Sequence, residues 1–157
     1  MTCTIRDIIK KKLETIEEMT SVQEAAKKMK DKNVSSLLVV DTDRKPLGLV
    51  TERDLVTKVC INDIHTSEVR SREIMSSPLI SINSSSSPSE AAEMMLKNNI
   101  RHLLVIDDKS NANKPIGIIT PLNFTRYQEY TIDEDKKAIE AVLNYLSSAD
   151  AEAISGV

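Results

Sequence analysis

Glycine is scarce in this chain, and so are aromatic residues. Among 157 residues the only glycines are Gly48, Gly117 and Gly156. A P-loop and a G-x-G-x-x-G turn both need several glycines close together, so the sequence excludes both kinds of phosphate-binding loop. Aromatic residues make up 3% of the chain and tryptophan is absent. Aliphatic side chains must therefore supply the core.

Cysteine is equally sparse. Cys3 and Cys60 are too few for a disulfide framework, and their spacing is not that of a zinc site. His65 and His102 are far apart and complete no metal-binding pattern. No apolar run approaches the roughly 20 residues that cross a bilayer, and the N-terminus shows no secretory signal. The sequence thus predicts a cytoplasmic protein without a membrane partner or a metal.

Clustered positive charge is also missing. The net charge is −3, and the largest basic cluster, Arg6 with residues 10–12, is interpreted as a solvated surface. No serine, threonine or cysteine stands in a context that would make it a nucleophile with a histidine partner. We therefore expect neither a nucleic-acid-binding protein nor an enzyme, and we expect no catalytic cofactor.

What the chain does contain is an internal repeat. Residues 5–41 align without gaps on residues 71–107, and 14 of these 37 positions are identical. Further on, K-P-L-G-L-V-T-E-R-D-L pairs with K-P-I-G-I-I-T-P-L-N-F after an insertion of three residues in the loop at 107–114. Insertions are tolerated in such loops. The two halves are copies of one unit.

Each copy predicts the order strand, helix, strand, strand, helix. The S-x-x-E segments at 21–24 and 87–90 match the capping-box pattern, which predicts that each opens the first helix of its copy. Two continuous apolar runs follow, which is typical of strands buried on both faces. These runs are residues 37–40 and 103–106, with second strands at 47–50 and 116–119 and a further helix beginning at Thr51 or Thr120.

A small sheet with helices on one face leaves its other face uncovered. Two such units would bury these faces by packing sheet against sheet about a pseudo-two-fold axis, which predicts an α+β fold of tandem βαββα repeats. A separate amphipathic helix is predicted over residues 133–148, with Ile139, Val142, Leu143 and Leu146 on one face. The predicted organisation is repeat 1 at 4–62, a linker at 63–70, repeat 2 at 71–130, and the C-terminal helix and tail at 131–157.

The motifs of the two copies resemble those of a known family. G-L-V-T-E-R-D (48–54) and G-I-I-T-P-L-N (117–123) follow the strand runs V-S-S-L-L-V-V-D and I-R-H-L-L-V-I-D. With the duplication, they resemble a pair of CBS domains, named after cystathionine β-synthase and together called a Bateman module. The resemblance covers about residues 4–127, and it implies a stand-alone CBS pair.

The resemblance also implies a ligand and its contacts. Family members bind adenosine nucleotides or S-adenosylmethionine in the clefts between repeats, and AMP is the ligand we expect here. The aspartate of the G-h-h-T-x-x-D segment holds the ribose hydroxyls, and the threonine lies near the ribose or phosphate. One cleft would join Thr51, Arg53 and Asp54 to Ser87, Ile100, Arg101 and His102. The other would join Thr120 and Asn123 to Ser21, Val34, Ser35 and Ser36.

A second interpretation of the same motif stays open. Thr51 and Asp54 also form a helix-capping pattern, which would need no ligand. Asn123 departs from the family pattern, and an amide lacks the charge assistance that a carboxylate gives to a bound diol. The second cleft also offers serines where the first offers a basic pair. We therefore expect the Asp54 cleft to bind more tightly.

Two functions are consistent with these features. The first is a non-catalytic energy or metabolite sensor, in which AMP, ADP, ATP or S-adenosylmethionine shifts conformation or assembly and an unknown effector protein reads the change. The alternative is a ligand-free structural or protein-interaction module that uses the C-terminal helix. The resemblance further implies a homodimer.

Overall fold

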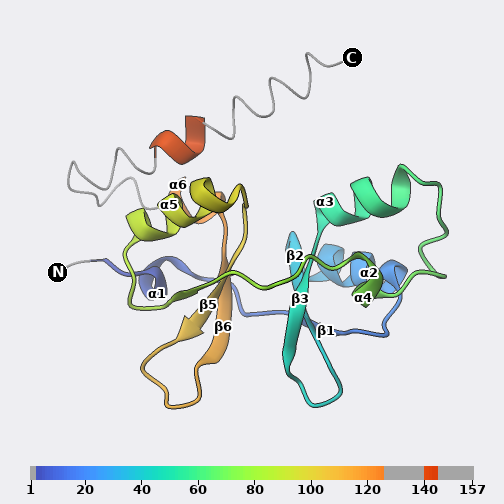
Figure 1. The fold of residues 1–157 in the computed structure, drawn as a ribbon, viewed down its shortest axis with the longest axis horizontal. Helices are drawn as coiled ribbons and strands as arrows, with labels where there is room; N and C mark the ends of the chain where they lie inside the picture. Colours follow the sequence, from blue (N-terminus) through green and yellow to red (C-terminus); the bar gives the residue numbers. More distant parts are fainter. Residues whose placement is uncertain (1–2, 126–139, 145–157) are drawn as a thin grey trace. The chain divides into compact units, whose positions relative to one another are not determined.

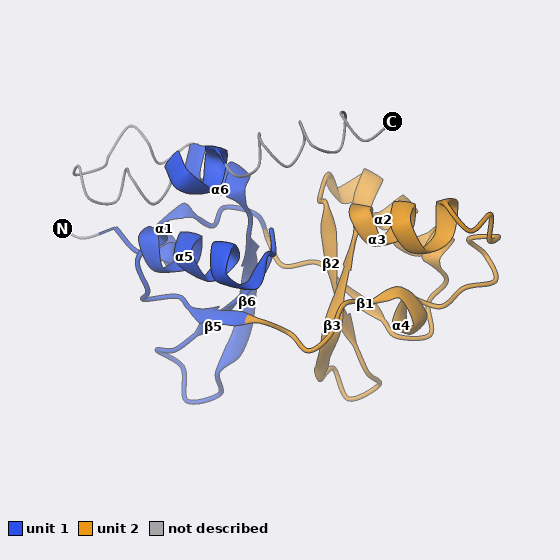
Figure 2. Ribbon diagram, turned by 45° about the horizontal axis from the view of Figure 1, so that its top comes forward, with its two compact units in different colours: residues 1–11, 81–157 blue, residues 12–80 orange. Residues whose placement is uncertain are grey.

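The computed structural model describes residues 3–125 and 140–144 of the chain. The chain forms two compact units, which Figure 2 distinguishes by colour: unit 1 comprises residues 1–11 and 81–157, and unit 2 comprises residues 12–80. Each unit combines a three-stranded sheet with helices, as Figure 1 shows. The predicted α+β class is confirmed.

The sheet of unit 2 runs in the order β1 (Thr15–Glu17), β2 (Ser36–Val40), β3 (Pro46–Thr51). β1 is parallel to β2, whereas β2 and β3 are antiparallel neighbours. All five residues of the central strand β2 are buried, which confirms the prediction from its continuous apolar run.

The helices of unit 2 pack their apolar faces into one core. They are α2 (Val22–Lys32), α3 (Glu52–Asp54), a π-helix η1 (Leu55–Cys60) and α4 (Ser71–Ile74). The core contains residues from both the sheet and all the helices except α3. Its buried members are Ile16, Val22, Ala25, Met29, Leu37, Val39, Val50, Val59 and Ile74.

Unit 1 repeats this topology. Its sheet, in the order β4-β5-β6, again joins a parallel to an antiparallel pair. The elements are α1 (Ile5–Ile8), β4 (Ser81–Asn83), α5 (Pro88–Asn98), β5 (Leu103–Asp107), β6 (Lys114–Ile119) and α6 (Pro121–Thr125).

Of the predicted C-terminal helix, the structure describes only residues 140–144, which are helical. Val142 is buried there, at 2% exposure. Ile139 and Leu146 lie outside the described residues. Among the helices of the part that is described, none is long and apolar enough to span a membrane.

Both long helices begin at the predicted serines. The Oγ of Ser21 accepts a hydrogen bond from the Glu24 N–H at 3.3 Å, and the Oγ of Ser87 accepts one from the Glu90 N–H at 3.2 Å. Of these two helices, only α5 has the complete reciprocal box, because the Ser87 N–H donates to the Glu90 carboxylate at 2.8 Å. At α2 the Glu24 carboxylate instead accepts from the Ser21 hydroxyl, where Ser21 forms a β-bridge with Arg70.

The short helix α1 packs in unit 1, although it begins the first sequence repeat. The Ile5 N–H donates to the Ser86 carbonyl at 2.9 Å, and the Arg6 N–H donates to the Ser84 carbonyl at 3.0 Å. These bonds attach α1 to the turn between β4 and α5, and Figure 1 shows α1 beside α5. The turn therefore satisfies N–H groups that the first helical turn leaves without intrahelical partners.

The helix α4 makes the equivalent contacts in unit 2. The Ser71 N–H donates to the Thr20 carbonyl at 2.8 Å, and the Arg72 N–H donates to the Glu18 carbonyl at 3.0 Å. Under the repeat alignment these bonds correspond one for one to those of α1. Each compact unit thus contains the opening helix of the other sequence repeat, and neither short helix was identified from the sequence.

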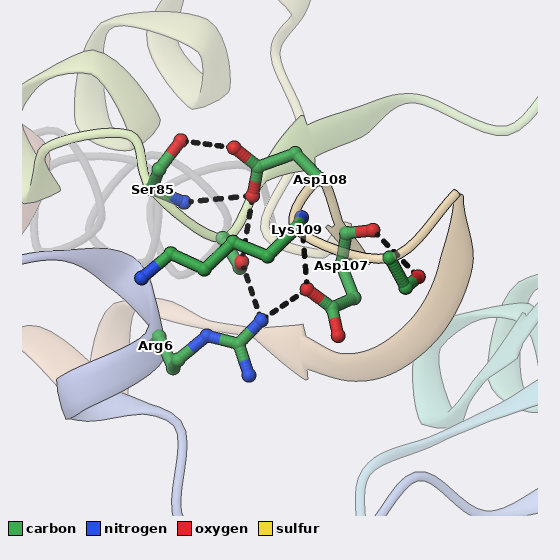
Figure 3. A network of polar contacts seen from close by, with 7 residues as sticks. Arg6, Ser85, Asp107, Asp108 and Lys109 are labelled. Carbon is green, nitrogen blue, oxygen red and sulfur yellow. Dashed lines mark hydrogen bonds and ion pairs between the residues drawn. The ribbon is translucent and has the colours of Figure 1, made fainter. Parts of the chain in front are cut away.

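Side chains strengthen the attachment of α1, as Figure 3 shows. The Arg6 guanidinium donates to the Ser84 Oγ at 3.0 Å and forms an ion pair with Asp107. The Asp108 carboxylate accepts from the Ser84 hydroxyl at 2.8 Å and from the Ser85 N–H at 3.2 Å, and it also bonds the Ser85 hydroxyl. The Ser85 and Ser84 hydroxyls stabilise the charged form, which lowers the pKa of Asp108 from 3.8 to about 2.

This shift predicts an acid-dependent loss of stability. Since the pKa of Asp108 is lower in the folded than in the unfolded chain, its stabilising contribution is full above about pH 4 and is lost as the pH falls through about 2. Asp108→Asn should therefore flatten the fall in urea midpoint over this range. The exposed Asp43→Asn serves as the control and should keep the wild-type slope. Equal slopes for Asp108→Asn and wild type would contradict the prediction.

Candidate functional site

The predicted T-x-x-D motif forms a tight elbow where β3 passes into α3. Thr51 has extended backbone angles, with φ −116° and ψ 162°, and caps α3. Its N–H and its hydroxyl both donate to Oδ2 of Asp54 at 2.9 Å, and the Asp54 N–H donates to the Thr51 hydroxyl at 3.2 Å. The elbow is thus a complete capping box, as the second interpretation of the sequence anticipated.

The other oxygen of Asp54 binds side chains from outside the motif. Oδ1 accepts from the Ser76 hydroxyl at 3.1 Å and from the Lys58 ammonium at 2.8 Å. The same ammonium donates to the Ile74 carbonyl at 2.7 Å. Asp54 is 6% exposed. Burial of a carboxylate is costly unless it is paired and hydrogen-bonded. The two Thr51 bonds to Oδ2, together with the Ser76 and Lys58 contacts to Oδ1, meet that requirement.

The glycine of the motif lets the chain near Ser76 approach. Leu49 of β3 and Ser76 exchange two backbone hydrogen bonds, of 3.1 and 2.8 Å. A Cβ at Gly48 would lie 2.8 Å from the Ser76 carbonyl oxygen and 2.9 Å from the Met75 sulfur. Only glycine leaves room for this contact, which in turn places the Ser76 hydroxyl beside Asp54.

The second elbow is similar, with an amide in place of the carboxylate, but the Asn123 N–H donates to the Thr120 carbonyl at 2.9 Å rather than to the hydroxyl. The N–H and hydroxyl of Thr120 donate to Oδ1 of Asn123 at 2.8 and 3.1 Å. The Asn123 amide nitrogen donates to the Ile8 carbonyl at 3.3 Å, at the end of α1. The amide therefore both accepts within the elbow and donates to the docked helix, which a carboxylate cannot do.

Unit 2 places several other predicted residues near Thr51. Ser36 is its strand partner across β2 and β3, and the Ser35 carbonyl accepts from the Glu52 N–H at 3.0 Å. Val34 follows the end of α2, and Arg53 is exposed on α3. The serines predicted to face Thr120 and Asn123 thus lie beside Thr51 within their own unit. Their pairing with residues of unit 1 remains a prediction.

Unit 1 holds the remaining predicted residues. Ser87 caps α5, Ile100 follows that helix, and Arg101 and His102 immediately precede β5. Leu103, the first residue of β5, pairs with Ile119, which precedes Thr120. Arg101 and His102 therefore lie near the second elbow within unit 1. Their predicted grouping with Thr51 and Asp54 likewise stays a prediction.

Two side chains at the first elbow were missed from the sequence. Lys58 follows Asp54 by four residues on a helix, a spacing at which opposite charges pair, so the ion pair had a local signal. Ser76 had none, because it aligns with Lys10 in the other copy and reaches Asp54 only through the β-bridge at Leu49.

A model of the CBS domain matches residues 5–60 and 71–130 of the chain. The chain belongs to the CBS domain family. Its two matched segments make it a CBS domain pair, a regulatory module. The predicted resemblance is therefore confirmed over most of the chain.

One relative matches in sequence, and two solved structures share the fold. A protein of Methanopyrus kandleri is 35% identical over 123 residues, which are 76% of this chain and 61% of the relative, so the alignment spans about three fifths of that protein. A CBS domain protein of Thermoplasma acidophilum matches with a TM-score of 0.75 at 22% identity, over 92% of this chain and 78% of that one. A CBS domain protein of Pyrobaculum aerophilum, complexed with AMP, matches with a TM-score of 0.69 at 20% identity, over 77% and 89%.

The two motif glycines offer a matched test of the close approach. Gly48→Ala should destabilise the protein by about 2 kcal/mol, since the new methyl group meets a backbone oxygen that cannot move aside easily. Gly117→Ala should cost less than about 1 kcal/mol, because its nearest neighbour is the end of the Ile9 side chain at 3.1 Å. Urea unfolding measures both values, and equal losses would contradict the argument.

Proposed function

We propose that this CBS pair is a non-catalytic sensor that binds an adenosine-containing ligand, with AMP as the first candidate. Family membership supports the proposal, and so does the Pyrobaculum aerophilum protein of the same fold that was complexed with AMP. The observation that carries it is the buried carboxylate of Asp54, because its two oxygens are held in different ways.

Oδ2 of Asp54 belongs to the cap, since it accepts a backbone N–H and the hydroxyl of Thr51. Among the described residues, the partners of Oδ1 are two side-chain groups, the Ser76 hydroxyl and the Lys58 ammonium. The Lys58 side chain is 41% exposed, so it can turn into solvent. A ribose hydroxyl can then take its place on Oδ1 while the capping box stays intact, and a charged acceptor strengthens that bond.

The second elbow is a poorer acceptor. The Asn123 oxygen already accepts both Thr120 donors, and its nitrogen donates to the Ile8 carbonyl. The ribose diol of a ligand could bind this oxygen only by replacing the hydrogen bonds from Thr120. This supports the expectation that the Asp54 elbow binds more tightly than the Asn123 elbow.

The remaining predicted contacts belong to the same proposal. Arg53 and Arg101 are the candidate phosphate ligands, because a guanidinium binds phosphate with paired hydrogen bonds. The other proposed ligand contacts are Thr51, Ser87, Ile100, His102, Thr120, Ser21, Val34, Ser35 and Ser36.

Thermal unfolding with AMP, ADP, ATP, S-adenosylmethionine and methylthioadenosine tests the proposal. A ligand at about 100 times its dissociation constant adds roughly 2.7 kcal/mol of stability, which for a chain of this length raises the Tm by roughly 5 to 10 °C. We expect such a rise with AMP, and we expect Asp54→Ala to abolish it. Asp43→Ala, which removes an exposed carboxylate of the same unit, should keep the full rise.

Titration calorimetry separates lost binding from lost stability, because Asp54→Ala also removes a cap. Binding of AMP to Asp54→Ala with wild-type affinity would refute the assigned site. No response of the wild type to any of the five compounds would make Asp54 a structural cap and favour the ligand-free interaction module.

We also propose that the chain forms a homodimer and that an effector protein reads its state. Val56, Ile61 and Ile64 are exposed large apolar residues within nine positions of unit 2, and apolar surface of this kind is often covered by a partner. Light scattering should give twice the chain mass, and Ile61→Glu should shift the protein toward the monomer. A wild-type monomer, or an unchanged Ile61→Glu dimer, would argue against this interface.

A further inference from the structure

The two units make the same connection with different chemistry. In unit 1 the Asn123 side-chain nitrogen donates to the Ile8 carbonyl at 3.3 Å. In unit 2 the donor to the equivalent carbonyl, that of Ile74, is the Lys58 ammonium at 2.7 Å. Ile8 and Ile74 occupy aligned positions of the repeat, and each is the last residue of a short docked helix. Both elbows therefore bind the terminal carbonyl of the helix beside them.

That carbonyl needs a donor from elsewhere. The last carbonyls of a helix have no intrahelical partner, and Ile8 and Ile74 are both buried. An asparagine at the elbow can accept from the threonine and still donate to the carbonyl. An aspartate can only accept, so an aspartate elbow needs a second side chain to supply the donor.

We infer that Asp54 and Lys58 act as one element that does the work of Asn123 alone. Lys58 is a positioning residue: its ammonium neutralises the buried carboxylate at 2.8 Å and joins η1 to the end of α4. At the second elbow the residue four positions after Asn123 is Tyr127, which carries no positive charge. The asparagine is thus a matched replacement for the pair.

The asparagine at position 123, where the family motif has aspartate, is on this inference a functional replacement and not a loss. An aspartate there would set a carboxylate against the Ile8 carbonyl, with no lysine at the aligned position. Restoring the family residue should therefore harm the second elbow. At the first elbow, Lys58 covers the oxygen that the proposed ligand would use, so the ligand must displace it. Only this last step rests on the proposed function.

A double-mutant cycle on the full chain tests the inference through urea unfolding. Lys58→Met should raise the unfolding equilibrium constant roughly tenfold, because it removes the positive charge beside Asp54 and the donor to the Ile74 carbonyl. The partial exposure of Lys58 limits the effect, since solvent screens part of the interaction. Asp54→Asn in wild type should cost a similar factor. In Asp54→Asn/Lys58→Met the new amide donates to the Ile74 carbonyl, so the double variant should be no less stable than either single variant.

The control pairs Asp54→Asn with Lys27→Met, because Lys27 is an exposed lysine of α2. The effects of these two substitutions on the unfolding equilibrium constant should multiply. Multiplication of the Asp54→Asn and Lys58→Met effects would overturn the inference. The cycle needs no ligand, so failure of every nucleotide to bind would overturn the proposed function without touching this result.

A variant in the other unit keeps the test decisive where a unit 2 variant fails to fold. Asn123→Asp should raise the unfolding constant roughly tenfold and speed hydrogen exchange at the Ile5 and Arg6 amides, which dock α1. Asn123→Ser should raise the unfolding constant less than Asn123→Asp does. The serine side chain is too short to reach the Ile8 carbonyl, but it adds no charge. An Asn123→Asp protein as stable and as protected as wild type would overturn the inference.

Discussion

Each unit of this protein depends on backbone hydrogen bonds between a short helix and a turn that is remote in the sequence. The amides of Ile5 and Ser71 donate to equivalent turn carbonyls in their respective units, and those of Arg6 and Arg72 do the same. A four-residue helix has no stability of its own, because nucleation costs more than one turn returns. The docked position is therefore set by tertiary bonds at the first amides and by the elbow at the last carbonyl.

In the proposed function, the elbow links this packing to ligand binding. Its polar atoms serve three tasks in a small space: they cap a helix, bind the end of the docked helix and, in the proposed function, receive a ligand. In unit 2 the tasks are divided among Thr51, Asp54 and Lys58, which leaves one carboxylate oxygen with partners that can be exchanged. In unit 1 Asn123 both closes the elbow with Thr120 and binds the end of the docked helix, and its oxygen already accepts two bonds. The same fold thus carries two elbows with different hydrogen-bond partners.

Much of this could be predicted from local sequence. The duplication follows from aligning the two halves of the chain. The serine caps of α2 and α5 and the buried central strands follow from spacing and residue type, since each depends on neighbours within a few positions. The capping role of Thr51 and Asp54 was visible for the same reason. Ser76 was not, because it reaches Asp54 through an isolated β-bridge at Leu49, and no pattern within the repeat marks that approach.

The sequence by itself determined the repeat, the α+β class and the family, because periodicity, caps and the G-h-h-T-x-x-D/N spacing are properties of short segments. Only the tertiary structure decided which segments complete each unit and what each elbow residue bonds. From the sequence, Asn123 was interpreted as a weaker substitute for aspartate. In the structure, its amide donates a hydrogen bond to the Ile8 carbonyl. A hydrogen bond between residues 115 positions apart depends on where the chain returns in space, and spacing along the sequence carries no information about that.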